Sequence, residues 1–274
     1  MMSSIAYCKN PQQALNTYLP GWQVLWNPTA VDGTYAFVAR NTGTNNYVVA
    51  VRGSLLDFSW GAFYNWIEQD LNVGTQVPWK YTQGVSNAQI SQGSWDAFQD
   101  LVNMTDPTTG QSLWMVLDAA PATSEIAVVG HSLGGNLATV FASYLFWNFS
   151  ASGHPRTNLS VCTFAAPAAG NQFFAQDFNG KLPNSMRFEN VNDIVPKFPV
   201  ATAVFDLGSL YVPSPNAEEI ILFHLGYDMS LSYFFDGVSF TIAGFEYKSG
   251  FYINGTWVNS SYTQPDGSGY LINV

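Results

Sequence analysis

Residues 125–149 contain the pattern that most restricts the fold of this chain: a short apolar run, a glycine-rich turn and a long apolar segment. The run EIAVVG (125–130) is typical of a parallel strand buried on both faces. GHSLGG (130–135) supplies the turn, and NLATVFASYLFWNF (136–149) predicts a buried helix. A strand that turns directly into a helix indicates a parallel sheet covered by helices.

The rest of the chain extends this alternation of strands and helices. Two antiparallel strands are expected at 34–41 and 46–53, on either side of the turn TGTN. Further elements are predicted as helices at 65–71, 94–105, 113–120 and 170–181 and as strands at 159–167 and 185–191. We therefore predict one α/β domain over 1–274 with a mainly parallel sheet. Its core spans about 20–230, and a β-rich extension, which includes a hairpin in 240–262, spans about 231–274.

Charge and composition exclude several functions. The net charge is −10 with only 9 Lys and Arg residues, which excludes a nucleic-acid partner. The three histidines, His131, His154 and His224, are too scattered to indicate a metal site, and there is no C-x-x-C motif. Cys162 lies in the apolar run LSVCTFAAP, far from Cys8 in the sequence, and is expected to be a free buried thiol.

The first residues contain no apolar run long enough for a signal peptide, and the 136–149 segment is too short to span a bilayer. Two locations fit: the cytoplasm, or the outside of the cell after removal of a signal peptide. We expect the second.

Residues 130–134 have the form G-x-S-x-G around Ser132. A serine exposed on a sharp strand-to-helix turn can act as a nucleophile, whereas a small polar residue in a glycine-rich turn is the simpler alternative. The residues two before and two after such a serine nearly collide, and here they are Gly130 and Gly134. The unpaired N–H groups at the helix start could hold an oxyanion. This agreement favours a nucleophile.

A serine nucleophile needs a base, and position favours one histidine. The side chain of His131 is expected to point away from that of Ser132. His154 follows the 136–149 helix and should lie at its far end. His224, in ILFHLGY, remains as the candidate base, with a core histidine as the alternative.

The candidate acid comes between Ser132 and His224 in the sequence. Asp177 falls inside a predicted helix, whereas Asp193 follows a predicted strand directly. Catalytic groups of open α/β sheets gather at the carboxyl ends of the strands, which favours Asp193. Its alternative role is that of a turn or helix-capping residue.

Four ordered motifs carry a family resemblance: VVAVRGS (48–54), GHSLGG, NVNDIVPKFP (190–199) and HLGY (224–227). Over about residues 35–230 the chain resembles the class 3 lipases, α/β-hydrolases that include fungal triacylglycerol lipases and feruloyl esterases. The resemblance implies Ser132 as nucleophile, Asp193 as acid and His224 as base. It also implies an oxyanion hole formed by Ser54 and Leu133. The chain departs from the family in ISQGSW (90–95), which lacks the usual histidine, and in its tail.

The segment 55–71 follows Ser54, where the family places its lid. It carries eight large apolar residues that a lid could use to cover the site in water and to contact lipid: Leu55, Leu56, Phe58, Trp60, Phe63, Tyr64, Trp66 and Ile67. An ordinary buried helix is the alternative.

These observations predict a serine carboxylester hydrolase that acts on acylglycerols at a lipid–water interface and needs no cofactor or metal. One alternative is an esterase for short-chain or aromatic, feruloyl-type esters, because aromatic residues make up an unusually high 16% of the chain and could line a phenolic pocket. The other is a non-catalytic relative that binds lipid or carbohydrate through the aromatic side chains of the tail.

Overall fold

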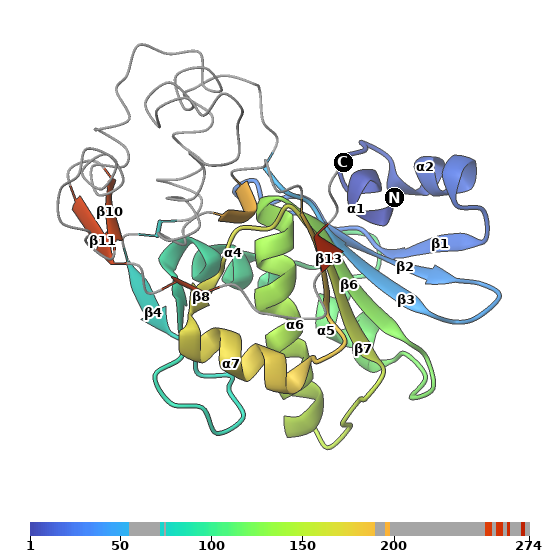
Figure 1. Cartoon of the computed structure of the whole chain (residues 1–274). Helices are drawn as coiled ribbons and strands as arrows, with labels where there is room; N and C mark the ends of the chain where they lie inside the picture. Colours follow the sequence, from blue (N-terminus) through green and yellow to red (C-terminus); the bar gives the residue numbers. More distant parts are fainter. Residues whose placement is uncertain are drawn as a thin grey trace, which may run out of the picture.

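The computed structural model describes residues 1–54, 72–73, 75–189, 195–197, 250–253, 256–259, 262–263 and 270–271. Within this part of the chain, a seven-stranded sheet has the order β1-β2-β3-β6-β7-β9-β13 (Figure 1). Its strands are β1 (Trp22–Trp26), β2 (Ala36–Asn41), β3 (Tyr47–Val51), β6 (Ile126–His131), β7 (Leu159–Phe164), β9 (Met186–Glu189) and β13 (Tyr270–Leu271). From β3 onward neighbouring strands are parallel, whereas β1, β2 and β3 pair antiparallel. The predicted α/β class is confirmed.

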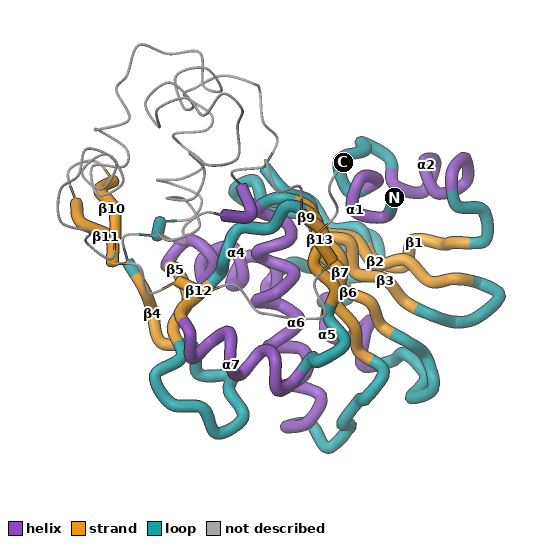
Figure 2. The backbone as a smooth tube through the Cα atoms, viewed as in Figure 1, coloured by secondary structure: helices purple, strands orange, loops and turns teal. Residues whose placement is uncertain are grey.

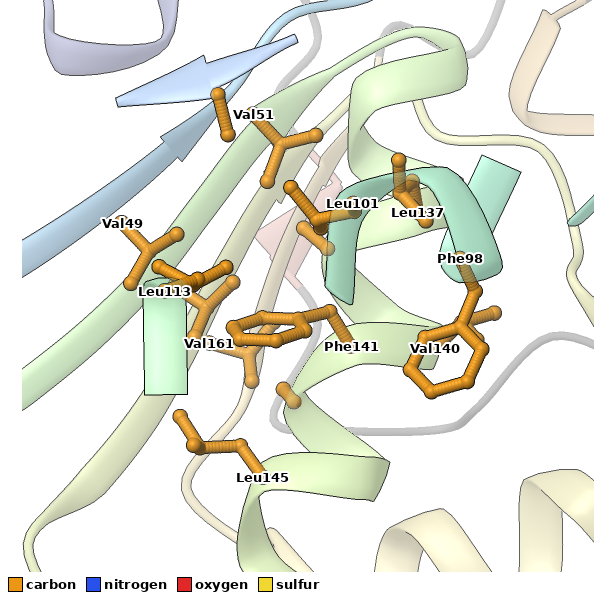
Figure 3. Close-up of a cluster of buried hydrophobic side chains, with 14 of the residues drawn as sticks. Val49, Val51, Phe98, Leu101, Leu113, Leu137, Val140, Phe141, Leu145 and Val161 are labelled. Atoms are coloured by element: carbon orange, nitrogen blue, oxygen red, sulfur yellow. The ribbon is translucent and has the colours of Figure 1, made fainter. Parts of the chain in front are cut away.

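Helices cover both faces of the sheet, because successive residues of a strand point to opposite sides. On one face, Val49 and Val161 of the sheet pack against α4 (Gln92–Asn103), α5 (Leu113–Asp118) and α6 (Leu133–Ala151). Figure 3 shows Phe141 and Leu145 of α6 pointing into this core. On the other face, Phe37, Ala39, Val48 and Ala50 meet residues of two N-terminal helices.

Those helices, α1 (Met2–Ile5) and α2 (Pro11–Tyr18), were not predicted from the sequence. Asn10 caps α2 by accepting a hydrogen bond from the N–H of Gln13 (3.0 Å), and Pro11 occupies the first helical position, where a missing N–H has no cost. Ile5 and Leu15 are buried against the sheet. Burial therefore stabilises segments that are too short to be stable helices alone.

The helices predicted at 94–105, 113–120, 136–149 and 170–181 are present, and three of them begin directly after a capping side chain. The helix predicted at 65–71 lies outside the described residues. Ser91 caps α4, Ser112 caps α5, and Asn171 caps α7 (Gln172–Lys181); each side chain accepts a hydrogen bond from a backbone N–H three residues on. The helix predicted at 136–149 extends over Leu133–Ala151, so it starts directly after Ser132.

A second, smaller sheet has the order β12-β8-β5-β4 (Figure 2). Its strands are β4 (Gln76–Pro78), β5 (Gln89–Ser91), β8 (Gly170–Asn171) and β12 (Tyr262–Thr263). In the tail, β10 (Gly250–Ile253) and β11 (Thr256–Asn259) form the antiparallel pair expected there. β12 pairs with β8 in the small sheet, and β13 pairs with β9 in the large sheet, so the tail contributes a strand to each. A short 3-10 helix, η2, covers Val195–Lys197.

Candidate active site

Ser132 lies at the turn between β6 and α6, in the middle of the large sheet. Its backbone has φ 57° and ψ −131°, a conformation that L-residues other than glycine rarely adopt. Its N–H donates to the carbonyl of Phe164 on β7 (2.9 Å), and its own carbonyl accepts from the N–H of Gly135 (2.8 Å). Such strain persists only where the surroundings hold it, and it concentrates at functional sites.

The two predicted glycines are required by close backbone contacts. A Cβ on Gly130 would lie 2.0 Å from the carbonyl oxygen of Gly134. A Cβ on Gly134 would lie 2.5 Å from the carbonyl oxygen of Val51, at the end of β3. The sequence prediction that a side chain at either position would clash is therefore confirmed. The same contacts bring the first turn of α6 against the end of β3.

Ser54 and Leu133 flank the serine from two different elements. β3 is the parallel neighbour of β6, and Ser54 follows it after Arg52 and Gly53. A Cβ on Gly53 would lie 3.3 Å from the Cβ of Ser132, so this segment passes directly beside the serine. Leu133 is the first residue of α6, where backbone N–H groups have no partner within the helix. The two predicted oxyanion-hole residues therefore lie at the same edge of the sheet as Ser132.

Asp193, His224 and the predicted lid at 55–71 lie outside the residues that the structure describes. For these residues the catalytic and lid roles remain predictions. The strand that leads toward Asp193 is described: β9 runs parallel to β7 and ends at Glu189. The carboxyl end of β9 thus points toward the same edge of the sheet as that of β6.

Of the other two histidines, His154 lies where the sequence predicted. His154 follows the carboxyl end of α6, at the opposite end of this helix from Ser132, and its Nδ1 is 3.2 Å from Oδ1 of Asp118. The ring of His131 is exposed, and its Nδ1 is 3.0 Å from the hydroxyl of Tyr7.

Tyr7 and Arg52 are neighbours of the site that the sequence did not indicate. The hydroxyl of Tyr7 lies next to Gly53: a Cβ on that glycine would lie 2.4 Å from the hydroxyl oxygen. Arg52 lies over the ring of Tyr35, with 4.9 Å between its Cζ and the ring centroid, and donates to the carbonyl of Gly33 (3.1 Å). Burial raises the pKa of Tyr35 to about 12, against the charge of Arg52. No local pattern could reveal these contacts, because Tyr7 and His131 are 124 positions apart.

Both cysteines are free: Cys8 is exposed, and Cys162 is half-buried on β7 rather than fully buried. In the described part of the chain, no helix is both long enough and apolar enough to cross a membrane.

Comparison with known proteins gives one family. A model of the family "Lipase (class 3)" matches residues 48–203. The secreted mono- and diacylglycerol lipase 1 of Fusarium solani is 26% identical over 167 residues, which cover 61% of this chain and 43% of that protein. The lipase of Rhizomucor miehei is 30% identical over 196 residues, which cover 70% and 48%. The chain thus spans about half the length of these curated relatives.

Solved structures agree in fold. A triacylglycerol lipase in which a serine protease triad forms the catalytic centre aligns with a TM-score of 0.57 at 25% identity, over 73% of this chain and 72% of that one. The M37 lipase aligns with a TM-score of 0.68 over 99% of this chain and 81% of that one, at 19% identity, a likeness of fold alone. The predicted α/β-hydrolase fold is confirmed.

Proposed function

The chain belongs to the class 3 lipase family, and from that membership we propose that it is a serine hydrolase that cleaves the ester bonds of acylglycerols. The observation that carries the proposal is the strained backbone of Ser132 between a central parallel strand and a buried helix. Gly130 and Gly134, which have no side chain, make this conformation possible. A serine placed in this way is presented at the edge of the sheet, where α/β enzymes bind their substrates.

In the proposed reaction, Ser132 Oγ attacks the ester carbonyl while His224 accepts the hydroxyl proton. Asp193 orients His224 and stabilises its charged form. The N–H of Leu133, the N–H of Ser54 and the Ser54 hydroxyl donate to the oxyanion of the tetrahedral intermediate. His224 then returns the proton to the leaving alcohol. A water molecule releases the fatty acid from the acyl-enzyme by the same steps in reverse order.

The two proposed oxyanion donors come from different segments of the chain, and close packing brings these segments together. Ser54 belongs to the segment after β3, whereas Leu133 begins α6. The backbone at 51–53 packs on Gly134 so closely that a single methyl group would not fit between them. Fixed donors of this kind stabilise charge without reorganising during the reaction, which is the largest single contribution in many enzymes.

We also propose that residues 55–71 form a lid. The segment follows Ser54 directly and carries the eight apolar residues given above. An apolar patch of that size is avoided on the surface of soluble proteins, so a closed form should dominate without lipid. The rate on a short-chain ester should then jump as the ester exceeds its solubility limit. A smooth hyperbola through that limit, with Trp60→Ser and Trp66→Ser leaving the rate on emulsions unchanged, would contradict the lid.

An extracellular location is also proposed, because two of the matching relatives are named as secreted mono- and diacylglycerol lipases. Their names also suggest mono- and diacylglycerols as the first substrates to test, ahead of triacylglycerols and aromatic esters.

The direct test is fatty-acid release from emulsified mono-, di- and triacylglycerols, measured by titration at constant pH. Ser132→Ala and His224→Ala should each lower turnover at least about a thousandfold, because triad residues act as a unit. His154→Ala is the matched control and should leave turnover unchanged. Retention of a tenth of the activity by a folded Ser132→Ala variant, or a large loss in His154→Ala, would overturn the assignment.

A further inference from the structure

The pairing between the neighbouring strands β3 and β6 ends next to the proposed nucleophile. The last parallel pair is Val51 with Gly130. Beyond it, Gly53 and Ser54 on one side and His131 and Ser132 on the other are no longer paired with each other. The two proposed oxyanion donors lie on these two segments, so contacts other than strand pairing fix the distance between them; the packing of Gly134 on the backbone at 51–53 is one such contact.

Tyr7 lies between these two segments. It follows α1, which packs against both β3 and β6. Its hydroxyl lies against Gly53, 3.0 Å from Nδ1 of His131 and 3.5 Å from the carbonyl oxygen of His131. The hydroxyl of one N-terminal residue therefore contacts both segments just beyond the point where the pairing between β3 and β6 stops.

The fit around Gly53 is tight. A Cβ there would lie 2.4 Å from the hydroxyl of Tyr7 and 2.5 Å from the carbonyl oxygen of His131. Tyr7, His131 and Ser132 thus fill the space that a side chain on Gly53, the residue before Ser54, would need. Burial raises the pKa of Tyr7, against the opposing effects of the nearby Gly53 backbone and the charge of Arg52. The phenol stays neutral, so it can accept one hydrogen bond and donate another.

We propose that Tyr7 is a positioning residue that holds the Gly53–Ser54 segment against the nucleophile turn and thereby sets the geometry of the oxyanion hole. This inference rests on the proposed function. The hydroxyl is bonded to His131 and packs against Gly53, so Tyr7 acts through these neighbours rather than on the substrate. Tyr7 precedes residues 48–203, which match the family model, so the N-terminal segment becomes part of the active-site support.

The test compares Tyr7→Phe, which removes only the hydroxyl, with Tyr18→Phe, which removes one from the neighbouring helix α2 on a residue that is 64% exposed. Turnover of p-nitrophenyl butyrate gives kcat and KM, and a phenylboronic acid serves as a probe of the tetrahedral intermediate. For Tyr7→Phe we expect kcat to fall about tenfold, the boronate Kd to rise by a similar factor, and KM to change less than about twofold. Tyr18→Phe should behave as the wild type.

A purely structural role predicts another result: a lower unfolding temperature with kcat and boronate affinity unchanged, which would overturn the proposal. Amide hydrogen exchange gives a second test on the unmodified protein. If Tyr7 holds this segment, the N–H of Gly53 should be protected, and unprotected exchange would contradict the contact between Tyr7 and Gly53 even if Tyr7→Phe failed to fold. A wild-type protein without esterase activity or fluorophosphonate labelling would refute the proposed function itself. A fully active Tyr7→Phe would refute the positioning role alone.

Discussion

Replacing Gly130 by alanine should destabilise the protein more than any ordinary glycine substitution. The new Cβ would lie 2.0 Å from the carbonyl oxygen, 2.3 Å from the carbonyl carbon of Gly134, and 2.7 Å from the nitrogen of Gly135. All three atoms belong to the backbone, so no side chain can rotate away. Relief requires moving the first turn of α6, which is bonded to the carbonyl of Ser132 through the N–H of Gly135 (2.8 Å).

Overpacking of a well-packed interior costs about 1–3 kcal/mol, and rigid backbone contacts place Gly130→Ala at about 3 kcal/mol or more. At roughly 2–4 °C per kcal/mol, the unfolding temperature should fall by about 6–12 °C, and ester turnover should be lost with the turn geometry. Gly180→Ala in α7 is the matched control. A Cβ there meets nothing within 4 Å, and the change should stabilise by about 0.5–1 kcal/mol. Circular dichroism melting measures both. A Gly130→Ala variant that melts within about 2 °C of the wild type and stays fully active would refute the steric argument.

Three further predictions follow from other parts of the molecule. Burial would raise the pKa of Asp106, but hydrogen bonds from backbone N–H groups in three residues outweigh it and leave the pKa lowered. Asp106→Asn should therefore lower the free energy of unfolding by about 1–3 kcal/mol above about pH 4. In urea titrations this difference from the wild type should shrink at lower pH, because the wild-type carboxyl becomes protonated. A difference that does not change with pH would contradict this. Lys181→Ala should cost about 3–5 kcal/mol in the same assay, because Lys181 lies 2.6 Å from Asp177 with both side chains almost fully buried; a cost below about 1 kcal/mol would show that the pair is not buried in solution. Ester turnover should rise with pH through about 6.5 if neutral His224 is the base, and a flat profile from about pH 5 to 8 would argue against it.

The part of the site that could be predicted from the sequence is local. Gly130, Ser132 and Gly134 lie within one turn, with a short apolar run marking the strand before them and a long one marking the helix after them. The steric need for glycine follows from that geometry alone, so neighbours in sequence determined the prediction. The antiparallel pair β2 and β3 was predictable for the same reason, since a short turn connects its two strands.

Features held by distant contacts were not predictable. α1 has only four residues, and what stabilises it is the burial of Ile5 against strands that come much later in the chain. β8 and β12 have two residues each, too few for any alternation of apolar and polar side chains to register. The contact between Tyr7 and His131 has the same origin, because it exists only after the N-terminal segment packs on the sheet.

Covalent labelling of Ser132 tests the central claim most directly. The full chain would be treated with a fluorophosphonate, digested and analysed by mass spectrometry, alongside Ser132→Ala. The proposed function predicts one phosphonylated residue, Ser132, with loss of ester turnover in proportion to labelling and no adduct in the variant. An unlabelled Ser132 in a folded, lipid-treated protein, or an equal adduct in Ser132→Ala, would contradict the claim that this serine is the nucleophile.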